Sequence, residues 1–202
     1  MKMKLLSAIA LLMIGHPAQA APDINKDYIR SLAAPGKMVL VIEYYDGAGN
    51  VVSRKGYSSP TPFQAASPTD IKVNDSTSIK LYGLKPCDGE FVNRRDDYAG
   101  SCDAYAKDQL AAMLKGSKVV FCRAFMTEAN AGTQNATCFS YTSFPGSMDS
   151  VDMIEEQLVS LGAVTVTTKA DGSPVRPDLA NAQKIAVEGA FGMWADPRTK
   201  KQ

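Results

Sequence analysis

The sequence predicts an α+β protein in which a small β-barrel or curled sheet is packed by helices. Short stretches rich in β-branched and aromatic residues dominate the first half, beginning with MVLVIEYY at 38–45. Apolar residues at helical spacing appear mainly after residue 100. The chain has 202 residues, enough for one domain with a substantial core.

The first 20 residues have the three parts of a secretory signal. Lys2 and Lys4 precede an apolar run at 5–14, and Ala18-Gln19-Ala20 matches the small-x-small cleavage pattern. The run is too short to span a bilayer. We therefore predict cleavage after Ala20 and export to the periplasm or the medium, and we expect no integral membrane protein.

Export changes the charge and the catalytic options. Loss of Lys2 and Lys4 turns the formal net charge of +1 into about −1, so overall charge does not favour nucleic acid or anionic lipid. The only histidine, His16, lies in the signal. The mature chain therefore lacks Ser-His-Asp and Cys-His catalysis and His-ligated metal centres.

Four cysteines lie in the mature chain, and an even count in an exported protein predicts disulfides. Zinc is the alternative, but no C-x-x-C pair is present. A hairpin centred near Asn130 brings Cys122 opposite Cys138. Cys87 then pairs with Cys102 by elimination, and we predict no metal site.

The order of elements follows from local patterns. We predict strands at 38–45, 51–53, 71–73, 78–84, 119–125, 136–141 and 164–167. We predict helices at 23–34, at 101–115, from 151 to 161, and from about 177. The segment 58–70 has three prolines and is predicted to be a loop, Trp194 is predicted to fill the core, and 196–202 is predicted to be a flexible tail.

Two of the predicted helices have apolar faces that can be assigned residue by residue. The helix from 151 presents Val151, Ile154, Leu158 and Leu161. The helix from 177 presents Leu179, Ala182, Ile185, Ala186 and Ala190.

Several motifs, in order, resemble the thermonuclease (staphylococcal-nuclease-like) family. They are IKLYGL at 79–84, CDAYAKDQLAAML at 102–114, VVFC at 119–122, ATC at 136–138, MIEEQLVSLGAV at 153–164 and GMWA at 192–195. The resemblance implies an OB-fold barrel with about three helices over residues 70–195. The segment 21–69 would then be an N-terminal extension that adds a β-hairpin and a Pro-rich loop.

Active members of that family hydrolyse phosphodiesters with calcium, two aspartates, a glutamate and two arginines. Carried over by position, the strand arginine is Lys80, a metal aspartate is Lys85, and the glutamate is approximated by Asp88. The second arginine has no counterpart between 130 and 136. A lysine in place of a metal ligand turns attraction into repulsion, so Lys80 and Asp88 are candidate catalytic positions of a degenerate site.

We therefore expect a non-catalytic binding module, without cofactor, whose partner is a protein or a nucleic-acid or other anionic ligand. Candidate anion-binding residues are Lys80, Lys85, Arg94 and Arg95, with Tyr82 as a stacking surface. A solvated, self-compensating loop at 94–97 is the simpler interpretation of the two arginines.

Two alternatives remain open. The first is an active metal-dependent phosphodiesterase with a rearranged site, in which Asp70 and Asp88 serve as metal ligands or base, Lys80 binds phosphate, and calcium is the cofactor. The second is a structural component of an envelope or secretion assembly, in which the MVLVIEYY hairpin offers an edge to a partner strand.

Overall fold

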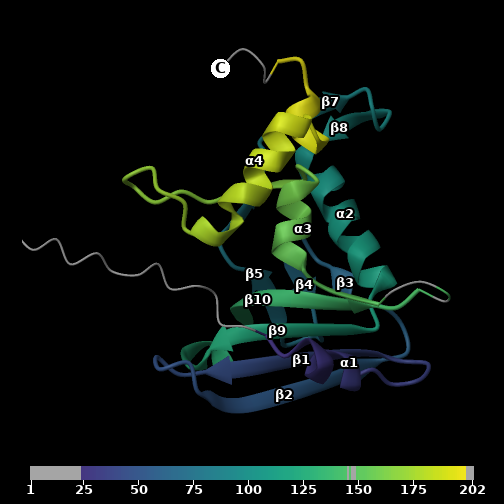
Figure 1. Cartoon of the computed structure of the whole chain (residues 1–202), viewed down its shortest axis with the longest axis vertical. Coiled ribbons are helices and arrows are strands. Elements are labelled where there is room, and N and C mark those ends of the chain that lie inside the picture. The colour runs from purple at the N-terminus through teal and green to yellow at the C-terminus, as the bar shows by residue number, and fades with distance from the viewer. Residues whose placement is uncertain (1–23, 145, 147–148, 199–202) are drawn as a thin grey trace, which may run out of the picture.

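A computed structural model of the chain describes residues 24–144, 146 and 149–198 (Figure 1). The helices are α1 (Lys26–Ser31), α2 (Cys102–Gly116), α3 (Ile154–Ser160) and α4 (Ala180–Gly189), with short 3-10 turns η1 (Met126–Asn130), η2 (Pro177–Leu179) and η3 (Gly192–Ala195). The strands are β1 (Met38–Tyr45), β2 (Val51–Ser59), β3 (Gln64–Ala65), β4 (Asp70–Lys72), β5 (Ser78–Leu81), β6 (Leu84–Pro86), β7 (Glu90–Asn93), β8 (Tyr98–Ser101), β9 (Val119–Phe125), β10 (Thr133–Thr142), β11 (Ser150–Met153) and β12 (Val164–Val166). The predicted signal at 1–20 lies outside the described residues.

The α+β class is confirmed, and the centre of the molecule is an eight-stranded sheet. Its order is β2-β1-β9-β10-β5-β4-β3, with β11 also paired to β10. Within the described residues the end strands β2 and β3 are not hydrogen-bonded to each other, so the predicted barrel is not closed. Two small sheets, β12-β6 and β7-β8, complete the strands.

The N-terminal hairpin is an integral part of this sheet. β1 lies between β2, its antiparallel partner, and β9, with which it runs parallel. The MVLVIEYY strand itself has no free edge, because both of its sides are paired; the open edge of the hairpin is its second strand, β2. β2 extends beyond the strand predicted at 51–53 to Ser59, and its last two residues lie in the segment 58–70 that was predicted to be a loop.

The two faces of the sheet are covered differently (Figure 1). Helices α2, α3 and α4 lie over one face and bury a large apolar cluster that includes Ile42, Ile79, Leu110 and Leu158. Helix α1 covers part of the opposite face with Ile29, against a smaller cluster. The near-continuous apolar run of β1 is explained by this position between two covered faces.

The helix boundaries differ from the sequence prediction at two places. The residues before Ile154 form strand β11, so Val151 packs from a strand, and α3 begins later than predicted. Leu161 and Ile185, predicted on apolar faces, are largely exposed. Leu161 is the C-cap residue and lies beyond the last turn of α3, whereas Ile185 lies in the middle of α4 on a side other than the one that buries Ala182 and Ala186.

The two predicted disulfides are confirmed. Cys122 and Cys138 are opposite each other on β9 and β10, and both are fully buried. Cys87 and Cys102 join the turn after β6 to the first residue of α2. The core position predicted for Trp194 is confirmed in part, since it packs partly buried against the main cluster.

The prediction of a flexible tail at 196–202 is wrong for Asp196 and Arg198, which are bonded to the rest of the fold. Asp196 is buried and accepts a hydrogen bond from the Val92 backbone at 2.9 Å. Arg198 donates to Asp196 and to the Glu90 carbonyl. Residues 199–202 lie outside the described part of the chain.

Candidate functional site

The residues predicted for the site are spread over several elements. Lys80 is exposed on β5, and Lys85 is exposed on β6, where it pairs in register with Thr165. Asp88 lies in the turn between β6 and β7. No hydrogen bond or ion pair among the described residues joins Lys80, Lys85 and Asp88 to one another. These three residues are therefore close in the sequence, but they do not form one bonded cluster.

Lys80 lies beside a carboxylate across the strands. Its register partners are Asp70 on β4 and Asn135 on β10. One oxygen of Asp70, Oδ2, accepts a hydrogen bond from Ser67, while Oδ1 is buried without a hydrogen-bond partner in the described structure. An unpaired buried carboxylate oxygen is costly, which makes Asp70 the most notable acidic residue near Lys80.

Asp88 lines a small cavity next to the Cys87–Cys102 disulfide. The cavity has a volume of about 240 Å³ and is also lined by Phe91, Trp194 and Arg198. The Cys87–Cys102 disulfide forms part of the same wall. Asp88 therefore faces a rim built by the disulfide and the C-terminal segment, and Lys80 does not line it.

The remaining predicted binding residues are Arg94 and Arg95. Arg94 is exposed in the turn between β7 and β8. Arg95 donates to the Gly189 carbonyl at 3.2 Å, and its guanidinium lies 5.4 Å from the centre of the Phe191 ring. Arg95 thus satisfies a carbonyl at the end of α4, a structural role that accounts for its position.

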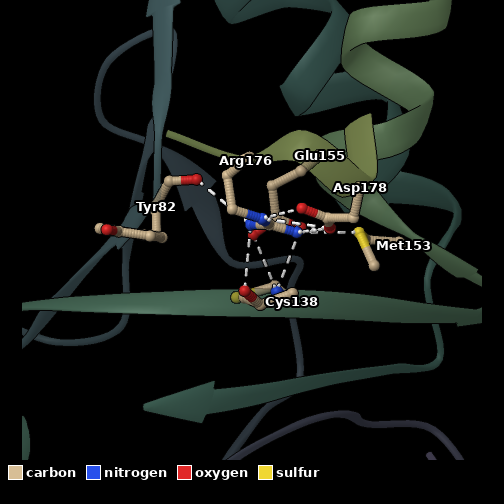
Figure 2. Close-up of polar contacts among 7 residues, drawn as sticks. Tyr82, Cys138, Met153, Glu155, Arg176 and Asp178 are labelled. Carbon is tan, nitrogen blue, oxygen red and sulfur yellow. Dashed lines mark hydrogen bonds and ion pairs between the residues drawn. The ribbon is translucent and has the colours of Figure 1, made fainter. Parts of the chain in front are cut away.

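The strongest constellation of charges is one that the sequence prediction missed. Glu155, Arg176 and Asp178 converge where strand β10 changes partners (Figure 2). On one edge β10 pairs with β5 over Thr133–Ala136 and with β11 over Phe139–Thr142. The two intervening residues have no strand partner on that edge, and the charged side chains fill this gap.

Glu155 accepts a hydrogen bond from the β10 backbone that no described strand accepts on this edge. Both carboxyl oxygens, Oε1 and Oε2, accept from the Cys138 backbone N–H, at 3.0 and 3.1 Å. The residue is fully buried, and burial raises its pKa to about 8, although the nearby charge of Arg176 opposes this. The carboxyl group therefore holds its proton near neutral pH.

Arg176 binds the other side of the gap. Its guanidinium donates to Asp178 at 2.7 Å, to the Tyr82 carbonyl at 3.3 Å and to the Thr137 hydroxyl at 3.1 Å. Burial works against its charge, but the hydrogen bonds that it donates to Asp178 and the charge of Glu155 leave the pKa of Arg176 raised. The Tyr82 ring itself stays largely exposed on the surface.

Within the Glu155–Arg176–Asp178 cluster, Glu155 and Arg176 are closed to ligands, whereas Asp178 is exposed. Glu155 is 0% exposed and Arg176 is 7% exposed. A cavity of about 550 Å³ between α2 and α3 comes near, but Met153 lies between it and the cluster, with its sulfur 3.3 Å from an Arg176 nitrogen. A general acid or base must reach its substrate, so this cluster acts on the fold.

The sequence contained one signal for Glu155. The buried residues of α3 are Ile154, Glu155, Leu158 and Val159, so Glu155 lies three and four residues before two core positions. That spacing puts it on the apolar face of the helix. Arg176 and Asp178 follow a loop and gave no comparable signal.

Among the described residues, no group of three or more Cys, Asp or Glu side chains is arranged to hold a metal ion. No helix in this part of the chain is both long and apolar enough to cross a membrane. No protein-family model matches the chain, and no curated protein matches it.

Proposed function

We propose that this chain is an exported thermonuclease-like domain that acts by binding a partner and does not hydrolyse phosphodiesters. The observation that carries the proposal is Lys85, an exposed cation on β6 at the position where the resemblance requires a metal-binding aspartate. Lys80, on the preceding strand β5 of the main sheet, adds a second cation. Two lysines that are not bonded to a carboxylate favour the binding of an anionic ligand over the binding of a divalent cation.

The proposed fold is an OB-like barrel that is opened between β2 and β3. The strands expected from the resemblance, β4, β5, β9 and β10, are adjacent or nearly adjacent in the main sheet, and α2, α3 and α4 pack on one face. The β1–β2 hairpin then widens the sheet at its far edge. Barrels of this kind bind extended ligands along their strands.

A cleavage assay tests the proposal. Mature protein, residues 21–202, is incubated with single- and double-stranded DNA and RNA in calcium, magnesium or chelator. We expect no more cleavage with metal than with chelator, because Lys85 repels the ion. Metal-dependent cleavage that is lost in Asp88→Ala and kept in the control Glu90→Ala would contradict the proposal.

A binding assay tests the anionic ligand directly. A fluorescent single-stranded DNA is titrated with wild type, with the double variant Lys80→Ala/Lys85→Ala, and with the control Lys184→Ala, which lies on the exposed side of α4. We expect the double variant to bind at least about tenfold more weakly, and the control to bind like wild type. Binding that is equal in all three proteins would show that Lys80 and Lys85 do not bind the DNA and would contradict the proposed site.

Asp70 is the observation that favours the alternative enzyme. Its buried oxygen without a hydrogen-bond partner in the described structure lies across from Lys80, and a cation would satisfy it. The Asp70→Asn variant belongs in the cleavage assay. If wild type cleaves and this variant does not, the chain is a phosphodiesterase that uses Asp70.

A further inference from the structure

Strand β2 leaves one whole side of the main sheet open. It is nine residues long and its residues are mostly exposed. Figure 1 shows β2 at the margin of the sheet, away from α2, α3 and α4. Its C-terminal end borders an open cavity of about 430 Å³ that separates it from β3 and β4. No other described strand pairs with this side.

The backbone of β2 presents hydrogen-bonding groups along this side. The Val39 N–H donates to Lys118, so Val39 directs its backbone toward β9 and away from β2. Its register partner Ser58 therefore directs its own N–H and C=O outward. The same alternation applies to Gly56 and Arg54, and none of these three residues has a backbone hydrogen bond on that side in the described structure.

The basic side chains of β2, Arg54 and Lys55, bind groups of their own chain. Arg54 donates to Glu43 at 2.7 and 2.9 Å and lies 4.8 Å from the centre of the Tyr28 ring. Lys55 donates to the Ala129 carbonyl. Lysine and arginine protect an edge strand when they extend beyond it; here the edge remains accessible.

We propose that β2 pairs with β2 of a second copy of this chain, antiparallel, with Gly56 of the two copies opposite each other on the twofold axis. The two eight-stranded sheets would then form one continuous sheet. The proposal concerns a surface remote from Lys80, Lys85 and Asp88, and it does not depend on the proposed binding function.

Charge excludes two of the other registers. Centring the pairing on Lys55 or on Arg54 would place two like charges directly opposite each other, which destabilises an antiparallel pair. Centring it on Gly56 places Lys55 opposite Tyr57 and Arg54 opposite Ser58. The Gly56 register therefore avoids the repulsion between like charges.

The same register sets the length of the ladder. The pair at Gly56 and the two pairs between Arg54 and Ser58 exchange about six hydrogen bonds, because each hydrogen-bonded antiparallel pair exchanges two. The next pair joins Val52 to Pro60, which has no N–H to donate. The ladder therefore ends where the sequence of β2 ends.

Sedimentation velocity of mature protein between 10 µM and 1 mM tests the dimer. We expect the mass to rise toward that of two chains, and Gly56→Pro to stay monomeric throughout. The Gly56 N–H faces outward, so proline is tolerated in the monomer. The control is Gly47→Pro in the same hairpin, in the turn closed by the Gly49 N–H on Asp46, and it should dimerise like wild type.

Cysteine pairing tests the register. Opposed hydrogen-bonded residues lie about 5.5 Å apart at Cα, within disulfide range. We expect Gly56→Cys to form a covalent dimer on oxidation, whereas Ser58→Cys, whose two copies lie about 13 Å apart along the strands, does not. A wild type that is monomeric at 1 mM, a dimer that persists in Gly56→Pro, or equal cross-linking of both cysteine variants would overturn the proposal.

Discussion

The Glu155 side chain is both a buried carboxyl group and a hydrogen-bond acceptor for the backbone. It is fully buried, and it is the acceptor for a backbone N–H that no strand can satisfy. A hydrophobic residue at this position would leave the Cys138 N–H unpaired, at a cost of about 1–3 kcal/mol. The burial that this role requires is also what raises the pKa of the carboxyl group to about 8.

Glu155 makes the stability of the fold depend on pH. Its pKa is about 8 in the folded chain and near 4.5 in the unfolded chain, so the folded state binds the extra proton between these values. Stability is therefore highest at low pH for this group and falls as pH rises toward 8, by up to about 1.4 kcal/mol per pH unit. Residues 21–202 contain no histidine, so few other groups there titrate between pH 5 and 8.

Urea unfolding of wild type at pH 5, 6.5 and 8 measures this dependence. We expect Glu155→Gln, which keeps an acceptor for Cys138 without a titrating proton, to flatten it. The exposed neighbour on the same helix, Glu156→Gln, is the control and should retain the wild-type slope. A wild type whose stability rises from pH 5 to 8 would contradict the assignment.

At the scale of elements, α3 and η3 meet backbone to backbone. The Met193 N–H donates to the Gly162 carbonyl at 3.0 Å. A Cβ atom on Gly162 would lie 2.2 Å from the Phe191 carbonyl oxygen, and one on Gly192 would lie 2.4 Å from the Gly162 carbonyl oxygen. Gly162 also has φ +63, so glycine both ends the helix and permits the contact.

Gly162→Ala should lower the free energy of unfolding by at least about 3 kcal/mol, since strain in the left-handed region alone costs 1–2 kcal/mol and the contact with Phe191 adds to it. Gly172→Ala is the matched control, because Gly172 has φ +82 and open space around it. Urea unfolding of both variants separates the two contributions. Equal losses would show that the close approach carries no energy.

At the scale of the molecule, the two disulfides close loops of similar length in different surroundings. Their cysteines are 15 and 16 residues apart, so chain entropy assigns each about 3 kcal/mol. Cys122 and Cys138 are both fully buried between two central strands. Cys87 is only partly buried at the edge of a cavity.

The double variant Cys122→Ala/Cys138→Ala should therefore lose more stability than Cys87→Ala/Cys102→Ala, because the smaller side chains also leave a cavity in the core. Urea unfolding without reductant measures both losses. We expect about 3 kcal/mol for the outer pair and a larger loss for the inner pair. A smaller loss for the inner pair would mean that the core closes around the missing sulfurs.

Sequence patterns were enough to predict the α+β class, most strand positions, helix α2 and both disulfide pairings. Each depends on local information: periodicity over one element, or the folding back of one hairpin around Asn130. The placement of Lys80, Lys85 and Asp88 on or beside adjacent short strands also followed from their order along the chain, although their bonding did not.

Contacts between distant parts of the chain fix which strand is central and which charges are buried, and local sequence patterns do not contain them. β1 pairs in parallel with β9, about 80 residues away, and local patterns do not specify a partner at that distance. The same holds for Arg176, which reaches Thr137 and Tyr82 across the fold. An unpaired stretch of β10 exists only once β5 and β11 are both in place, and this is the physical reason that the role of Glu155 is visible only in the folded chain.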